Sequence, residues 1–278
     1  MKPQIVLIEC SDQKGLVHVV TAVFLRHGLN IITNNEFVDQ DTSRFYMRSE
    51  VEGEVKPDLL CGELISVLPA GASVRLPSTD KRRIVVMATR EYHCLGDLLL
   101  RHTFGDLNAT IAAVVANRET LGPLVGRFDI PFHFLSHENK SKAAHEEEVL
   151  ATLQTYDPEY IILAKYMRIL SPEFVARYRN RIVNIHHSFL PAFAGAHPYR
   201  QAFDRGVKII GATAHYVTEV LDEGPIIAQG VIPVDHTYSV ADMARAGRDV
   251  ETTVLAKALK LVFDERVFLC GQRTVILA

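Results

Sequence analysis

The sequence predicts an α/β protein of two domains, a ferredoxin-like βαββαβ domain and a larger Rossmann-like domain with a mostly parallel sheet. Two observations predict this class. Short apolar runs rich in β-branched residues alternate with stretches whose apolar residues repeat at helical spacing. The pattern of these elements changes after a polar, charged stretch at residues 78–83, which we interpret as a linker between domains at 1–77 and 84–278.

The first domain is expected to follow the order βαββαβ. Residues 4–10 read QIVLIEC, an apolar run typical of a buried strand. Apolar side chains between residues 15 and 27 fall on one helical stripe, and Gly28 fits the end of that helix. The same patterns predict the remaining elements, which are strands at 30–39 and 44–51, a helix at 57–68 and a strand at 72–76.

The second domain alternates strands and helices, as expected of a doubly wound sheet. Its first strand, Ile84 to Ala88, is a continuous apolar run, which is typical of a parallel strand covered on both faces. Longer strands at 208–218 and 225–233 are expected to be antiparallel at one edge, and a long helix begins near Ser239. The other predicted elements are strands at 109–116, 132–135, 160–164 and 181–185, helices at 93–103, 141–155 and 172–178, and two short strands in the tail 266–277.

Composition excludes several classes of function. The net charge is −3 and no basic block occurs, so nucleic acid is not an expected partner. No apolar run is long enough to span a membrane, and the N-terminus has no signal-peptide pattern. The four cysteines are scattered without a CxxC pair, which favours free thiols in a reducing compartment. We therefore expect a cytoplasmic protein.

Asn184, His186 and Asp222 are the most informative polar residues of the second domain. The first two stand at the end of a predicted strand, where ligands bind in doubly wound sheets, and alternate strand residues point the same way. An amide can donate to an oxyanion, and an imidazole can transfer protons near neutral pH. A carboxylate can favour the imidazolium or accept a proton. This set is sufficient for acyl transfer without a covalent intermediate.

Other interpretations of these residues remain open. An asparagine or histidine at a strand end is more often a hydrogen-bonding loop residue than a catalyst. His186 and His187 are adjacent and so face opposite ways, and no HExxH spacing occurs, so no metal is expected. No GxGxxG follows the first strand and no GxSxG context occurs, so neither a dinucleotide nor a serine nucleophile is expected. Small residues in the following loop would let a substrate approach the backbone; they are Ala192, Gly195 and Ala196.

Three ordered segments carry a resemblance to the folate-dependent formyltransferase superfamily. They are ILAKYMRIL at 162–170, NIHHSFLP at 184–191 and HYVTEVLDEGP at 215–225. The resemblance implies that Asn184, His186 and Asp222 are catalytic and that 10-formyltetrahydrofolate is the substrate, with no separate cofactor. It also implies a pteridine pocket formed by Met167, Arg168, Ile169, Leu170 and Gly224. The alternative for the apolar members of this segment is simple core packing.

The loop after the first strand of the second domain distinguishes branches of the superfamily. Glycinamide ribonucleotide formyltransferases have a glycine-rich phosphate loop there, whereas this chain reads ATREYHCLGD at 88–97. Without an acceptor-phosphate site, water is the expected acceptor. The segment from His93 to Asp97 is similar to that of formyltetrahydrofolate deformylases, which release tetrahydrofolate and formate, supply formate for purine synthesis and balance the one-carbon pool. The alternatives are a formyltransferase with an amine acceptor such as glycinamide ribonucleotide, and a non-catalytic folate or amino-acid sensor.

The first domain looks like an ACT domain, because Asp12-Gln-Lys-Gly-Leu16 follows its first strand. Deformylases carry such a domain ahead of the hydrolase domain, so the resemblance spans nearly the whole chain. It implies a homo-oligomer whose activity responds to glycine and methionine. The candidate effector-binding residues are Asp12, Gly15, Leu16, Asn30 and Ile31. The alternative is a purely structural dimerisation unit.

Overall fold

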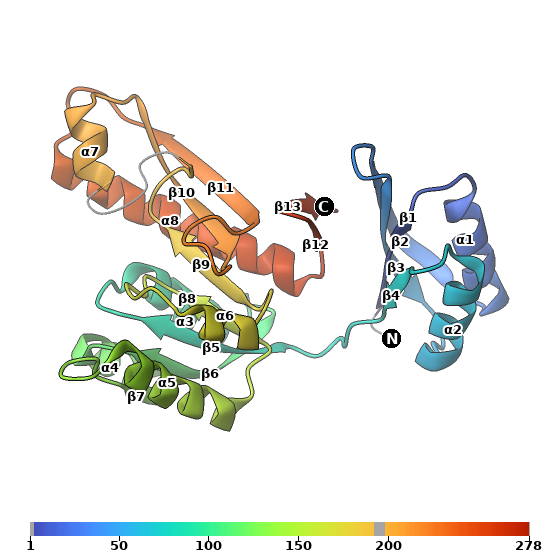
Figure 1. Cartoon of the computed structure of the whole chain (residues 1–278), viewed down its shortest axis with the longest axis horizontal. Coiled ribbons are helices and arrows are strands. Elements are labelled where there is room, and N and C mark those ends of the chain that lie inside the picture. Colours follow the sequence, from blue (N-terminus) through green and yellow to red (C-terminus); the bar gives the residue numbers. More distant parts are fainter. Residues whose placement is uncertain (1–2, 192–197, 278) are drawn as a thin grey trace. The chain divides into compact units, whose positions relative to one another are not determined.

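A computed structural model describes residues 3–191 and 198–277 of the chain (Figure 1). The chain divides into two compact units. One comprises Met1–Asp80, Glu265–Cys270 and Thr274–Ala278, and the other comprises Lys81–Asp264 and Gly271–Arg273. Among the helices of the described ranges, none is both long enough and apolar enough to cross a membrane.

The first unit is a four-stranded antiparallel sheet whose core is formed with two helices. Its elements are β1 (Gln4–Ser11), α1 (Leu16–Arg26), β2 (Asn30–Asp39), β3 (Arg44–Glu52), α2 (Pro57–Val67) and β4 (Ser73–Arg75). The strand order β2-β3-β1-β4 is the arrangement expected of a ferredoxin-like unit. Val6 and Ile8 of β1 share a buried core with Val20 and Phe24 of α1 and Leu60 of α2.

A C-terminal hairpin covers the opposite face of this sheet. It consists of β12 (Val267–Cys270) and β13 (Arg273–Ile276). Phe268 packs edge-on against Tyr46 of β3, and Leu7 of β1 belongs to the same buried cluster. The sequence pattern assigns this tail to residues 84–278, whereas the structure groups most of it with the first unit. An apolar strand pattern shows that a strand is buried but does not identify what covers it, so the sequence could not reveal this placement.

The second unit contains a seven-stranded mixed sheet in the order β11-β10-β9-β8-β5-β6-β7. The strands from β9 to β7 are parallel, and β10 and β11 are antiparallel at one edge, which confirms the predicted sheet. The chain runs from β5 to β6 and β7 and then returns to β8 on the other side of β5, so the winding reverses between β5 and β8. The strands are β5 (Arg82–Ala88), β6 (Ala109–Ala116), β7 (Phe132–Phe134), β8 (Tyr160–Leu163), β9 (Ile182–His186), β10 (Ile209–Tyr216) and β11 (Ile226–Pro233).

The helices of this unit are α3 (His93–Phe104), α4 (Gly122–Val125), α5 (Lys142–Tyr156), α6 (Pro172–Arg177), α7 (Pro198–Asp204) and α8 (Val240–Phe263). Ser239 caps α8 in a capping box with Asp242, as its sequence predicts. Two details differ from the predicted elements. The sequence pattern does not indicate α7, and β5 begins at Arg82, inside the stretch interpreted as a linker.

Candidate active site

Strand β9 positions two of the three predicted catalytic residues at its carboxyl end. It pairs in parallel with β8 and antiparallel with β10. Asn184 and His186 alternate with buried Ile185, so their side chains leave the same face of the strand. Asp222 lies in the connection between β10 and β11, and this connection returns toward the end of β9. The small loop residues Ala192, Gly195 and Ala196 lie outside the described residues.

The structure brings the three predicted residues together and adds a fourth. The Nδ1 atom of His186 lies 3.3 Å from an Oδ1 oxygen of Asp222. His215 of β10 is paired with Asn184 across the sheet, and its Nε2 atom lies 3.2 Å from the Asn184 amide nitrogen. The same Nε2 atom is 3.8 Å from Asp222 Oδ1. His215 stands in the motif HYVTEVLDEGP, but only the register of β9 and β10 reveals that it faces Asn184.

His215 fixes the orientation of the asparagine amide. Its Nδ1 atom lies 2.8 Å from the carbonyl oxygen of Tyr216, so Nδ1 carries the hydrogen and Nε2 accepts from Asn184. Burial lowers the pKa of His215, which keeps the ring neutral in this arrangement. An amide nitrogen carries two hydrogens, so Asn184 can keep one on His215 and offer the other to a ligand oxygen.

Asp222 and His186 form a pair with one open position. Burial alone would raise the pKa of Asp222, but the hydrogen bond from His186 and the electrostatic interaction with the same ring outweigh it and lower that pKa. Asp222 is therefore a carboxylate at neutral pH. The Nε2 atom of His186 is buried and has no hydrogen-bond partner within the described residues; the same holds for the hydroxyl of Ser188. A buried polar atom without a partner costs about 1–3 kcal/mol, which marks Nε2 as a position for a ligand.

Gly224 holds the Asp222 connection against β10. A Cβ atom at this position would overlap the carbonyl oxygen of Tyr216, so only glycine allows the approach. The Tyr216 amide also donates to the carbonyl of Pro225. Asp222 itself has a φ of 57°, a left-handed conformation that the clamped connection maintains. The structure thus gives Gly224 a packing role, and its predicted substrate contact stays a prediction.

The segment predicted to line the pteridine pocket follows β8. Met167 and Ile169 are 59% and 60% exposed, so the core-packing alternative is wrong for these two side chains. Leu170 packs against the buried core, as that alternative expects, and Arg168 is partly buried. The Met167 amide donates to the Thr89 hydroxyl at 2.9 Å, which ties the segment to the end of β5. The segment follows β8, which pairs with β9, and its two exposed apolar side chains are suited to the face of a flat ring system.

The predicted effector residues lie in the first unit, around the start of α1 and β2. Gly15 has a φ of 89° and precedes α1, with open space where a Cβ would be. Asp12 is exposed and its amide donates to Ser43 in the β2–β3 turn. Leu16 is buried and Ile31 packs against the core, so these two contribute chiefly to packing. Asn30 is exposed at the start of β2.

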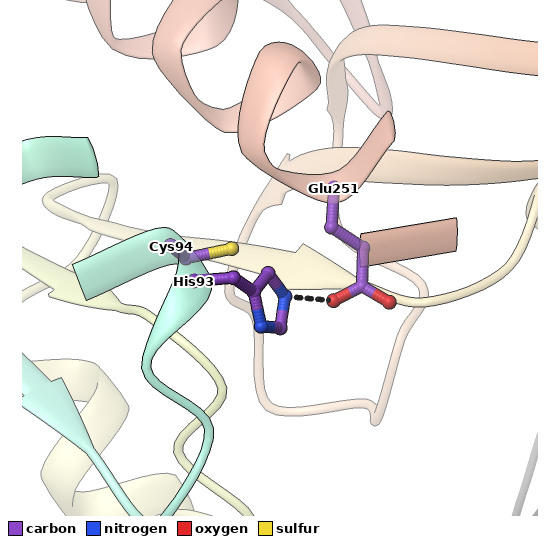
Figure 2. A group of neighbouring side chains, drawn as sticks. All are labelled: His93, Cys94 and Glu251. Carbon is purple, nitrogen blue, oxygen red and sulfur yellow. Dashed lines mark hydrogen bonds and ion pairs between the residues drawn. The ribbon is translucent and has the colours of Figure 1, made fainter. Parts of the chain in front are cut away.

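One group of side chains in the second unit has the composition of a metal site. The ligand atoms of His93, Cys94 and Glu251 all lie within 4.8 Å of one another (Figure 2). Their chemistry does not suit a cation. Burial raises the pKa of the Cys94 thiol, and the charge of Glu251 raises it further, so the thiol stays protonated. The ammonium of Lys165 already lies 3.1 Å from Glu251 and would repel a cation.

Comparisons with known proteins agree with this geometry. Residues 82–259 match the formyl transferase family. The chain is 56% identical over 268 residues to the formyltetrahydrofolate deformylase of Escherichia coli O6:H1, which covers 96% of each chain. The chain belongs to the formyltetrahydrofolate deformylase family. The predicted family membership is thereby confirmed.

Solved structures distinguish the two branches. A formyltetrahydrofolate deformylase from Pseudomonas syringae pv. tomato matches with a TM-score of 0.94 at 37% identity, covering 100% of this chain and 95% of that one. A glycinamide ribonucleotide transformylase from Symbiobacterium toebii matches with a TM-score of 0.69 at 30% identity, covering 76% of this chain and 100% of that one. The deformylase relative thus accounts for both units, and the transformylase is a more distant structural relative.

Proposed function

We propose that this chain hydrolyses 10-formyltetrahydrofolate to tetrahydrofolate and formate. Membership of the deformylase family supports the reaction. The observation that carries the proposal is the buried, unpartnered Nε2 atom of His186, whose other ring nitrogen is held by the Asp222 carboxylate. A ring nitrogen in this state can take a proton from water and return it to a leaving nitrogen.

The first step is attack of water on the formyl carbon. His186 Nε2 takes a proton from the water, and Asp222 stabilises the imidazolium through Nδ1. The carbonyl oxygen of the formyl group becomes an oxyanion, which the free Asn184 amide hydrogen stabilises. His215 keeps that amide aimed, because its own Nδ1 is bound to Tyr216.

The second step is collapse of the tetrahedral intermediate. The imidazolium Nε2–H gives its proton to the folate nitrogen that carried the formyl group, and the bond between that nitrogen and the formyl carbon breaks. The products are tetrahydrofolate and formic acid, His186 returns to its neutral form, and the acid loses its remaining proton to solvent to give formate. Exposed Met167 and Ile169 supply apolar surface for the pteridine, and Arg168 and Leu170 belong to the same segment.

The test is formate release by the purified chain from 10-formyltetrahydrofolate with no amine present. We expect one formate and one tetrahydrofolate for each substrate consumed. A requirement for glycinamide ribonucleotide would contradict the proposal and favour the transferase alternative. In the cell this reaction would supply formate for purine synthesis and balance the one-carbon pool. Free cysteines at the four positions support a reducing, cytoplasmic location.

We also propose that the first unit is an ACT-like regulatory domain of a homo-oligomer that binds glycine or methionine. The ferredoxin-like strand order and the open, left-handed Gly15 beside exposed Asp12 support this role. Calorimetric titration of the full chain with each amino acid, alongside formate release, tests it. Neither heat nor a change of rate with either amino acid would favour a purely structural unit.

A further inference from the structure

A buried network surrounds Glu251 of α8, apart from the three predicted catalytic residues. Its carboxylate receives hydrogen bonds from His93 Nε2 at 2.7 Å and from the Tyr199 hydroxyl at 2.7 Å, and Lys165 Nζ lies at 3.1 Å. The Glu251 side chain is 1% exposed. Burial raises the pKa of this carboxyl group, but the hydrogen bonds from His93 and Tyr199 and the charge of Lys165 outweigh it and lower the pKa to about 2. We call Glu251, His93, Lys165 and Tyr199 the Glu251 cluster.

The cluster occupies the place where a doubly wound sheet binds its ligands. His93 begins α3, in the connection that follows β5, and Lys165 follows β8. These two strands are neighbours, and the winding of the sheet reverses between them. Ligands bind outside the carboxyl ends of the strands at such a reversal. In this chain, side chains from α3, α7, α8 and the end of β8 lie there instead.

The ring of His187 lies between the Glu251 cluster and the proposed catalytic imidazole of His186. The rings of His186 and His187 stack with centroids 4.8 Å apart, so the expectation that these adjacent residues face opposite ways is wrong, because β9 ends at His186 and strand alternation stops there. The His187 ring centroid lies 6.4 Å from that of Tyr199. The pKa of His187 is lowered to about 4, first by burial and then by the charges of Lys165 and His186. His187 is therefore a neutral spacer between the two groups.

Helix α8 makes room for the phenol of Tyr199. A Cβ atom at Gly247 would overlap the Tyr199 hydroxyl and ring. Glycine inside a helix costs roughly 0.5–1 kcal/mol relative to alanine, so a packing reason is expected for it. Here the glycine admits a large ring next to His187, which stacks on His186.

We propose that the Glu251 cluster determines acceptor specificity by filling the space that an amine acceptor would need beside the formyl group. The proposal rests on the proposed hydrolysis and names the side chains that restrict the nucleophile to water. With the space open, an amine nitrogen would bond to the formyl carbon as the carbon–folate nitrogen bond breaks. One amine proton would pass to the folate nitrogen, giving a formamide and tetrahydrofolate in place of formate and tetrahydrofolate.

The experiment compares Tyr199→Ala with Tyr199→Phe in the full chain, with glycinamide as the amine probe. Tyr199→Phe is the matched control, because it removes the hydroxyl but keeps the ring. The readout is the ratio of N-formylglycinamide to formate at fixed 10-formyltetrahydrofolate. We expect Tyr199→Ala to raise this ratio about tenfold or more, since pocket shape discriminates by roughly 10–200-fold. Tyr199→Phe should leave it within about twofold of the unaltered chain.

A second pair of variants, His93→Ala and His93→Gln, keeps the proposal testable if Tyr199→Ala does not fold, as judged by circular dichroism. His93→Ala should raise the ratio and His93→Gln should raise it less, because glutamine keeps the bulk. An unchanged ratio in a folded alanine variant overturns the proposal, as does an equal rise in Tyr199→Phe. Failure of the unaltered chain to release formate would instead overturn the proposed hydrolysis.

Discussion

Two histidine–carboxylate pairs of the second unit, His186–Asp222 and His93–Glu251, differ in how completely their carboxylates are satisfied. Each histidine keeps one buried ring nitrogen without a hydrogen-bond partner in the described structure, Nε2 of His186 and Nδ1 of His93. The Asp222 side chain is 18% exposed. The Glu251 side chain is 1% exposed, accepts hydrogen bonds from His93 and Tyr199, and forms an ion pair with Lys165. The Asp222 carboxylate is therefore partly accessible to a ligand, whereas the Glu251 carboxylate is enclosed by its partners.

This difference between the two carboxylates corresponds to two proposed roles, proton transfer at Asp222 and exclusion of an amine acceptor at Glu251. A proton can be moved only by a group with an unused lone pair or hydrogen in reach of the substrate. A saturated buried carboxylate instead fixes the groups around it, because each loses a strong partner if it moves. A histidine and a carboxylate therefore take part in the reaction at His186 and Asp222, and they maintain the shape of the site in the Glu251 cluster.

The largest expected effect comes from removing the acid–base groups of the proposed catalytic pair. His186→Ala and Asp222→Asn should each lower kcat by about 10²–10⁴-fold, the typical contribution of a positioned acid–base group. Binding of tetrahydrofolate, measured by fluorescence titration, should change little. The matched control is His236→Gln, an exposed histidine of the same unit. Near-normal turnover by His186→Ala would contradict its assigned role.

Replacing the enclosed Glu251 carboxylate should change the free energy of unfolding rather than remove an acid–base step. Glu251→Gln removes one partner of a buried ion pair and leaves the Lys165 charge uncompensated, which costs about 3 kcal/mol. Urea unfolding followed by circular dichroism measures this cost. Asp222→Asn, whose carboxylate is more exposed, should lose distinctly less free energy of unfolding. Equal losses of unfolding free energy in Glu251→Gln and Asp222→Asn would contradict the proposed difference between the two carboxylates.

The pH dependence of this cost has a defined sign. The pKa of Glu251 is about 2 in the folded chain against an ordinary value of 4.5, so the unfolded chain binds the proton more readily. Its stabilising contribution is complete above 4.5 and is lost as the pH falls toward 2. The gap in unfolding free energy between the unaltered chain and Glu251→Gln should therefore narrow below about pH 4.5. A gap independent of pH would contradict the charged state of Glu251.

The residues of the proposed catalytic site could be predicted from the sequence, whereas the Glu251 cluster could not. Alternation along β9 places Asn184 and His186 on one face, and the motif at 215–225 indicates Asp222. The Glu251 cluster could not be predicted in the same way, because its members come from α3, α7, α8 and the end of β8. Local spacing does not encode such long-range contacts. The exposed state of Met167 also required the structure, since an apolar side chain after a strand usually belongs to a core.

Met167 exposes apolar surface to solvent, and a ligand that covers this surface would bind more tightly. Met167→Ser should raise KM about fivefold and leave kcat nearly unchanged, which corresponds to losing about 1 kcal/mol of uniform apolar binding. Leu100→Ser is the matched control, since Leu100 is an exposed apolar residue of α3 outside the predicted pocket segment. Steady-state kinetics with 10-formyltetrahydrofolate separates the two constants. A fall in kcat with unchanged KM would show that Met167 acts on the transition state rather than on binding of the pteridine.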